Sequence, residues 1–256
     1  MNEVIDMRIS GSSTMPGGEY GNVTISGAGK IQGSVKCTRL SCSGAASVNG
    51  DVVAEEISCS GAVKVNGSAQ CNGRLATSGR FQAEGSIQAG EVKCSGSIRI
   101  TGNLSGDFIR ISGSLEVRQN VSGKHVKSSG ICRIGEGVEA ETVELAGRTE
   151  IAGLLNAETI TILAEGSSEI GDIGCTTVTV SRRQQGQGLL AQLFSRAIGG
   201  LTVGTIEGDE IRLEHTKAKV VRGKQVVIGP GCEIDRVEYT ESCQAEAGTV
   251  AESIKL

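Results

Sequence analysis

The sequence of 256 residues has no tryptophan, two tyrosines, three phenylalanines and two histidines. So few aromatic side chains exclude a wide globular core, because aromatic residues supply much of the volume of such cores. Any interior must therefore be narrow and lined by small aliphatic side chains. No apolar run approaches the roughly 20 residues of a membrane-spanning helix. The first residues, MNEVIDMR, also lack the basic and then apolar pattern of an export signal, so the expected location is the cytoplasm.

An excess of basic residues is also missing. The chain has 25 Lys and Arg against 29 Asp and Glu, a net charge of −4 with both signs scattered along the sequence. Nucleic-acid binding needs a basic face and usually stacking aromatics, so nucleic acid is not an expected partner. The nine cysteines are expected to be reduced thiols, because no export signal accompanies them and an odd number cannot form a complete disulfide set.

What the sequence has in abundance is glycine, with 38 residues, many of them in a regular repeat. A Ser-Gly pair recurs eight times, from Ser10-Gly11 to Ser129-Gly130, and Ala146-Gly147 continues the series at the same spacing. The spacing stays at about 17 residues throughout, and a fixed period of this length is typical of one coil of a solenoid.

Within each period, small or apolar residues alternate with polar residues in three short pairs. This alternation predicts three short strands per coil, each with one buried face, and coils that stack as parallel strands. Glycine is expected at the corners, often with positive φ. One predicted inward ladder consists of Ile25, Cys42, Cys59, Thr77, Cys94, Ile111, Ser128, Leu145 and Ile162.

The sequence therefore predicts an all-β fold, a right-handed parallel β-helix in the form of a triangular solenoid with about 17 residues per coil. Left-handed helices repeat in strict hexads, whereas this coil divides roughly into six, six and five residues. The expected organisation is coils over 1–181, an extruded loop over 182–200, further coils over 201–240, and a frayed or capping tail over 241–256.

The expected loop contains an amphipathic helix. Its apolar half consists of Leu189, Leu190, Leu193, Phe194, Ala197 and Ile198. Burial of each large side chain in this set contributes about 1.5–3 kcal/mol of free energy. The apolar face is therefore expected to be covered and not left in water. This face has two alternative binding surfaces. One is an apolar patch of the solenoid itself, and the other is a membrane surface, where Arg182, Arg183 and Arg196 would assist binding.

No catalytic, cofactor or metal site is predicted. The cysteines never form a C-x2-C pair and the chain has only His125 and His215, which argues against zinc. The repeated corner serine has no His and Asp context. The stretch SGKH at 122–125 lacks the glycine and the Ser or Thr of a phosphate loop, and no pair of carboxylates stands out as an acid and a base. The chain is therefore expected not to be an enzyme and not to bind a nucleotide.

The coils over 7–180 and the stretch IEGDEIRLEHTKAKVVRGKQVVIGPGCEIDRVEYT at 206–240 resemble the bactofilins, specifically the longer members found in Firmicutes. Bactofilins are polymer-forming bacterial cytoskeletal proteins with a right-handed β-helical core. The resemblance implies nucleotide-independent filaments that grow by end-to-end stacking of β-helices. It also implies a scaffold role near the membrane, for envelope proteins.

The two open ends of a β-helix favour self-association independently of this resemblance, because unpaired strand edges pair with another chain unless they are capped. Val237 and Tyr239 are the candidate contact residues near the C-terminal end. One alternative is that the first coil and the tail cap both ends and leave a monomeric binding or adaptor module. A less favoured alternative is a solenoid enzyme acting on carbohydrate or acyl groups.

Overall fold

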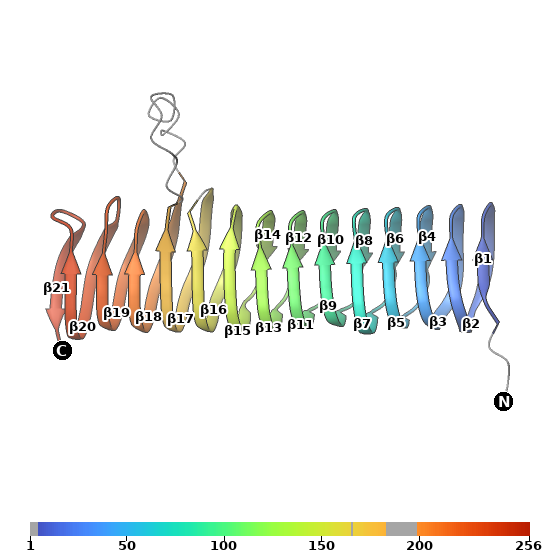
Figure 1. The fold of residues 1–256 in the computed structure, drawn as a ribbon, viewed down its shortest axis with the longest axis horizontal. Helices are drawn as coiled ribbons and strands as arrows, with labels where there is room; N and C mark the ends of the chain where they lie inside the picture. The colour runs from blue at the N-terminus through green and yellow to red at the C-terminus, as the bar shows by residue number, and fades with distance from the viewer. Residues whose placement is uncertain (1–4, 165, 183–198) are drawn as a thin grey trace, which may run out of the picture. The chain divides into compact units, whose positions relative to one another are not determined.

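The computed structural model describes residues 5–164, 166–182 and 199–256. These residues form an all-β chain that divides into two compact units, Met1–His125 and Val126–Leu256. Each unit is a parallel β-solenoid, in which successive coils lie side by side (Figure 1). The predicted β-solenoid is therefore confirmed. The amphipathic helix was predicted for residues 188–198, which lie outside the described residues.

The first unit begins with one short strand and two long strands, and then alternates strands of four residues with strands of eight or nine. The strands are β1 (Met7–Ile9), β2 (Ser12–Ile25), β3 (Ala28–Cys42), β4 (Ala45–Val48), β5 (Val52–Cys59), β6 (Ala62–Val65), β7 (Ala69–Thr77), β8 (Arg80–Ala83), β9 (Ile87–Cys94), β10 (Ser97–Ile100), β11 (Leu104–Ile111) and β12 (Ser114–Val117). β13 (Val121–Ser128) contains the boundary between the two units.

The second unit contains mostly long strands that turn corners without interruption. They are β14 (Ile131–Ile134), β15 (Val138–Ala146), β16 (Arg148–Leu163), β17 (Ser167–Ser181), β18 (Gly200–Leu213), β19 (Thr216–Ile228), β20 (Glu233–Ala245) and β21 (Val250–Lys255). β20 and β21 pair from Ile234↔Val250 to Tyr239↔Lys255, so much of the segment expected to be a tail continues the solenoid.

The strand register agrees with the period of the sequence, with local exceptions. In the first unit Val35 pairs with Val52, and Val52 pairs in turn with Ala69, so each pairing advances the chain by one repeat. Across the predicted insertion, β17 and β18 pair directly, with Ile170 opposite Val203. The insertion at 182–200 therefore leaves the stacking of its two flanking coils intact.

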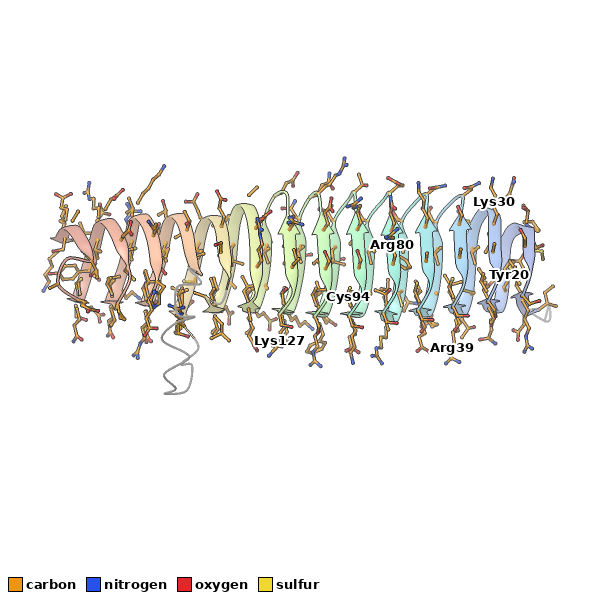
Figure 2. The ribbon with its side chains drawn as sticks, turned by 90° about the horizontal axis from the view of Figure 1, so that it is seen from above. Tyr20, Lys30, Arg39, Arg80, Cys94 and Lys127 are labelled. Carbon is orange, nitrogen blue, oxygen red and sulfur yellow. The ribbon has the colours of Figure 1, made fainter. Side chains whose placement is uncertain are left out.

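The interior of each unit consists of stacked columns of aliphatic and thiol side chains. Each regular coil buries three pairs of alternating residues, as predicted; in one coil these are Ala46 and Val48, Val52 and Ala54, and Ile57 and Cys59. Every member of the predicted inward ladder is 4% exposed or less. Figure 2 shows Cys94 within the ribbon, whereas Lys30 and Arg39 project from it. Burial of these columns supplies the hydrophobic stabilisation of a chain that has few aromatic residues.

From Gly27 to Gly113, the glycine of each Ser-Gly corner is required by a close approach between coils. Positive φ was expected there, but none of the described Ser-Gly corners has a glycine with positive φ. A Cβ added to Gly44 would instead lie 2.0 Å from the carbonyl oxygen of Gly27, and one added to Gly61 would lie 1.9 Å from that of Gly44. The corner backbone is this close because Ser43 N and Gly44 N both donate to Ile25 O, at 2.9 and 3.2 Å.

A ladder of side-chain acceptors stabilises the second corner of each coil in the first unit. Ser34 Oγ accepts a hydrogen bond from Asp51 N at 3.0 Å, and Asp51 Oδ1 accepts one from Ser68 N at 2.8 Å. The same bond recurs along the column at Ser68, Ser86 and Asn103. This ladder was not predicted from the sequence, although its signal is visible as a small polar acceptor directly after Gly33, Gly50, Gly67, Gly85 and Gly102.

Outward charges mostly pair between adjacent coils. Examples are Arg39 with Glu56 at 2.9 Å and Arg99 with Glu116 at 2.8 Å. These side chains are largely exposed, so each pair contributes about 0–1 kcal/mol to stability. The pairs therefore favour the correct register more than they stabilise the fold.

Candidate functional site

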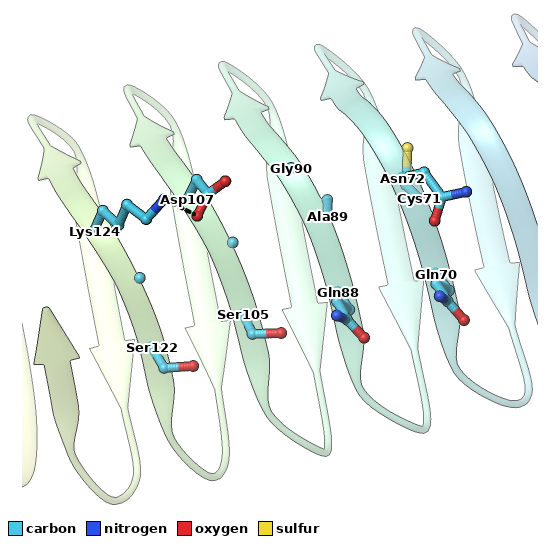
Figure 3. Close-up of a pocket in the computed structure, with 12 residues that line it drawn as sticks. Gln70, Cys71, Asn72, Gln88, Ala89, Gly90, Ser105, Asp107, Ser122 and Lys124 are labelled. Atoms are coloured by element: carbon cyan, nitrogen blue, oxygen red, sulfur yellow. Dashed lines mark ion pairs between the residues drawn. The ribbon is translucent and has the colours of Figure 1, made fainter.

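A shallow groove of about 420 Å³ runs across β7, β9, β11 and β13 of the first unit (Figure 3). Its floor is the inward column that contains Ala54, in which the residues shrink from Cys71 and Ala89 to Gly106 and Gly123. A Cβ at Gly106 would lie 2.6 Å from Ala89 O, and one at Gly123 would lie 2.4 Å from Gly106 O. The hollow is therefore fixed by backbone packing, because no larger side chain fits at these two positions.

One wall of the groove is a row of uncharged polar side chains, one from each coil: Gln70, Gln88, Ser105 and Ser122 (Figure 3). Gln70 is in register with Gln88, and Gln88 with Ser105, so the row repeats at the strand spacing of about 4.8 Å. Within the described residues none of these four side chains makes a hydrogen bond. Their amide and hydroxyl groups are therefore free to bind a ligand.

The other wall carries the only charges that line the groove among the described residues. Lys124 Nζ lies 3.1 Å from Asp107 Oδ1, and this ion pair leaves the groove without net charge.

An aromatic residue follows each member of this ion pair in the sequence, Phe108 after Asp107 and His125 after Lys124. The rings of Phe108 and His125 are stacked with centroids 5.1 Å apart and planes at 16°, and Phe108 is 41% exposed. Phe108 and His125 thus form an aromatic pair that directly follows the groove-lining residues Asp107 and Lys124 in the sequence.

A second groove, of about 950 Å³, lies in the second unit at the same positions of the coils. Its floor includes Ala157, Gly208 and Gly223, and charged side chains border it. Arg222 donates a hydrogen bond to Glu238 Oε2 at 2.7 Å, which lowers the pKa of the Glu238 carboxyl below its usual value. This groove differs from the first because acidic residues outnumber basic residues along its lining.

The cysteines form buried columns in which the thiols are held protonated. Seven of the nine are buried, and burial raises the pKa of Cys42 and of Cys94 to about 11. A thiol with such a pKa is a poor nucleophile at neutral pH. In the ranges that the structure describes, no group of three or more His, Cys, Asp and Glu residues is arranged to hold a metal ion.

The predicted self-assembly residues lie one coil in from the last strand. Val237 is fully buried and stands in register with Ser253 of β21, so its side chain packs inside the coil. Tyr239 is half-buried and in register with Lys255. The predicted membrane or partner helix residues, Leu189, Leu190, Leu193, Phe194 and Ile198, lie outside the described residues. Nowhere in the described chain does a helix reach the length and apolarity needed to cross a membrane.

The groove of the first unit was not predicted from the sequence. The inward columns were predicted correctly. In one of them the side chains become smaller from coil to coil until they are glycine, and this change was not interpreted as a hollow. Alternation shows which side chains point inward. Depth depends on side-chain size along a column, which is visible only after the coils have been aligned in register.

The fold and its surfaces define this chain as a parallel β-solenoid with lateral grooves and open coil ends. It is similar to two Bacillus subtilis (strain 168) proteins described as uncharacterized, YhbF (46% identical over 84 residues, 33% of each chain) and YhbE (45% identical over 78 residues, 30% of this chain and 32% of YhbE). The matched segments span about a third of the length of these relatives. No family model and no solved structure matches the chain.

Proposed function

We propose that this protein is a self-assembling cytoskeletal scaffold of the bactofilin kind, a nucleotide-independent polymer built by end-to-end stacking of right-handed, three-sided β-helices. The observation that carries the proposal is the state of the terminal strands. Among the described residues, β1 pairs only with β2 and β21 pairs only with β20. Their outer edges present backbone groups that another strand can pair with.

The side chains at the two ends also support assembly. Tyr20 and Tyr239, the only tyrosines in the chain, occupy a coil position that is Cys, Ala or Gly in the coils between them, in register with Cys37 and Gly223. Val250 and Ile254 of β21 are only half-buried. The two most exposed large hydrophobic side chains of the described residues also lie at the two ends, Ile5 at 68% and Leu256 at 66%, and apolar surface favours association.

The proposed partner is a second copy of this chain, and the proposed location is the cytoplasm. A membrane surface or an envelope protein is proposed as a further partner of residues 189–198, on the basis of their sequence alone. No catalytic residue or cofactor takes part in the proposed function.

Sedimentation velocity and negative-stain microscopy at physiological salt, without added nucleotide, test the assembly. We expect the full-length chain to form particles that lengthen as the concentration rises through the micromolar range. Val250→Lys should shift the chain toward a monomer, because an edge lysine opposes strand pairing. Val227→Lys is the matched control, since Val227 is 39% exposed in β19, away from either end.

A wild-type chain that stays monomeric at every concentration would contradict the proposal. It would favour the second candidate, a monomeric binding or adaptor module. The lateral groove of the first unit is the specific observation in favour of that candidate. An enzyme acting on carbohydrate or acyl groups is less well supported, because the only carboxylate lining this groove in the described residues is Asp107, which is paired with Lys124.

A further inference from the structure

We propose that the groove of the first unit binds an extended, uncharged β-linked glycan. This site lies along the side of the coils, so it does not depend on assembly through the ends. Binding sites usually combine a concave surface with a few polar groups that converge on it. The floor of small residues and the row from Gln70 to Ser122 meet that description (Figure 3).

The absence of net charge selects the class of ligand. Lys124 and Asp107 neutralise each other at 3.1 Å, and the remaining polar side chains of the lining are amides and hydroxyls apart from one thiol. A phosphate or a polyanion would find no free cation in this lining, and a basic peptide would find no free carboxylate. Asn72 donates to Glu55 Oε1 at 2.8 Å, but the amides and hydroxyls of the row from Gln70 to Ser122 lack internal partners. They match the hydroxyl groups of a sugar, which both donate and accept hydrogen bonds.

The repeat distance favours a chain over a single sugar. The row places one free polar side chain per coil, about 4.8 Å apart, along four coils. This distance is close to the length of one ring in an extended β-1,4-linked glycan. Adjacent rings of such a chain are turned by about half a turn, so each ring lies near one polar side chain and every second ring presents the same edge to the row. A curved α-linked chain does not keep this match along the groove.

The aromatic pair supplies the apolar contact that sugars need. The C–H face of a pyranose ring is apolar and carries partial positive charge, which suits the negative face of an aromatic ring. Phe108 is 41% exposed and is adjacent in sequence to Asp107 of the groove wall. Its stacking on His125 fixes the orientation of the ring before a ligand binds. Binding without cleavage is expected, because glycoside hydrolysis uses two carboxylates and this lining has one.

Saturation-transfer difference NMR on the full-length chain tests the proposal with three neutral probes at millimolar concentration. Cellotetraose and chitotetraose are extended and β-linked, and maltotetraose is curved and α-linked. We expect transfer from the protein to at least one of the β-linked probes, and a several-fold weaker transfer to maltotetraose. Phe108→Ala and Gln88→Leu should each reduce the transfer several-fold.

Gln32→Leu is the matched control, because Gln32 is an exposed glutamine of the same unit outside the groove, and it should leave the transfer unchanged. Circular dichroism establishes that each variant keeps its strands. Absence of transfer to both β-linked probes would overturn the proposal. Equal transfer to all three probes, or transfer that survives both groove variants, would overturn it as well.

Discussion

At the scale of single residues, one pair of like charges stands in register on neighbouring strands of the first unit. The charged residues placed in register there are of opposite sign, as with Arg39 and Glu56, or Arg99 and Glu116. The exception within the described registers is Lys93, which is in register with Arg110 on β9 and β11. Like charges directly opposite each other on neighbouring strands are destabilising. This pair should therefore lower the stability of the folded state.

Lys93→Glu is expected to raise the free energy of unfolding by a few tenths to about 1 kcal/mol at low salt, because it converts the repulsion into an attraction between exposed groups. Urea unfolding at low and high ionic strength measures the effect, which should shrink as salt screens it. Lys30→Glu is the control, since its register neighbours Thr14 and Ser47 are uncharged. Equal stabilisation by both substitutions would show that net charge, and not the pair, is responsible.

The buried thiols give a residue-scale prediction about pH. Burial raises the pKa of Cys94 from 9.0 to about 11, so the folded chain keeps a proton that the unfolded chain releases. The stabilisation from this thiol is fully present below pH 9 and is lost as the pH rises toward 11. Unfolding free energies measured between pH 8 and pH 11 should fall less steeply in Cys94→Ala than in the wild type. Identical slopes would mean that this thiol titrates normally in the folded state.

At the scale of the structural element, the corner glycines make the clearest prediction. A Cβ at Gly61 would lie 1.9 Å from the carbonyl oxygen of Gly44, whereas a Cβ at Gly11 would meet nothing within 4 Å. Both glycines follow a serine at the same corner of a coil. Gly61→Ala should therefore destabilise the chain by at least about 1–3 kcal/mol through overpacking.

Gly11→Ala should be neutral or stabilise the chain by about 0.4–1 kcal/mol, because it restricts only the unfolded state. Thermal and urea unfolding of the two variants measure the difference. Similar losses in both would indicate a requirement for the glycine conformation itself, and would restore the explanation that sequence analysis offered for this corner.

The corner glycine also shows how far sequence analysis could go. The period of Ser10-Gly11 and its repeats, together with alternation, was enough to predict the coils and the buried ladder, because both signals are visible along the linear sequence. The distance between Gly61 and Gly44, the acceptor ladder through Asp51 and the depth of the groove at Gly106 depend on neighbouring coils. They require the register, and the register varies locally, as at the irregularity after Ala54 where β5 pairs with β7.

The C-terminal segment illustrates the same limit. Its acidic sequence after Glu241 lacks the Ser-Gly repeat, so it was expected to be frayed or to form a cap. In the structure Val250 is instead in register with Ile234, and Lys255 with Tyr239, and these pairs add one more strand to the second unit. Backbone pairing extends the solenoid here although the side chains do not follow the inward pattern.

At the scale of the whole molecule, a solenoid is stabilised by contacts between neighbouring coils only, so its ends should open more easily than its middle. β1 at the N-terminal end of the first unit and β21 at the C-terminal end of the second each have one paired neighbour among the described residues. β6 has paired neighbours on both sides, β4 and β8. Amide hydrogen exchange in dilute solution should therefore be fast in β1 and β21 and slow in β6.

Assembly through the ends would change this gradient in a specific way. If a second copy pairs with the terminal strands, raising the protein concentration through the micromolar range should slow exchange in β1, in β21 or in both, because the outer N–H groups gain partners. Exchange in β6 is the internal control and should not depend on concentration. Val250→Lys should abolish the dependence in β21 while leaving β6 protected. Fast, concentration-independent exchange at both ends would mean that the open edges stay unpaired, and it would leave the lateral groove as the better supported basis for function.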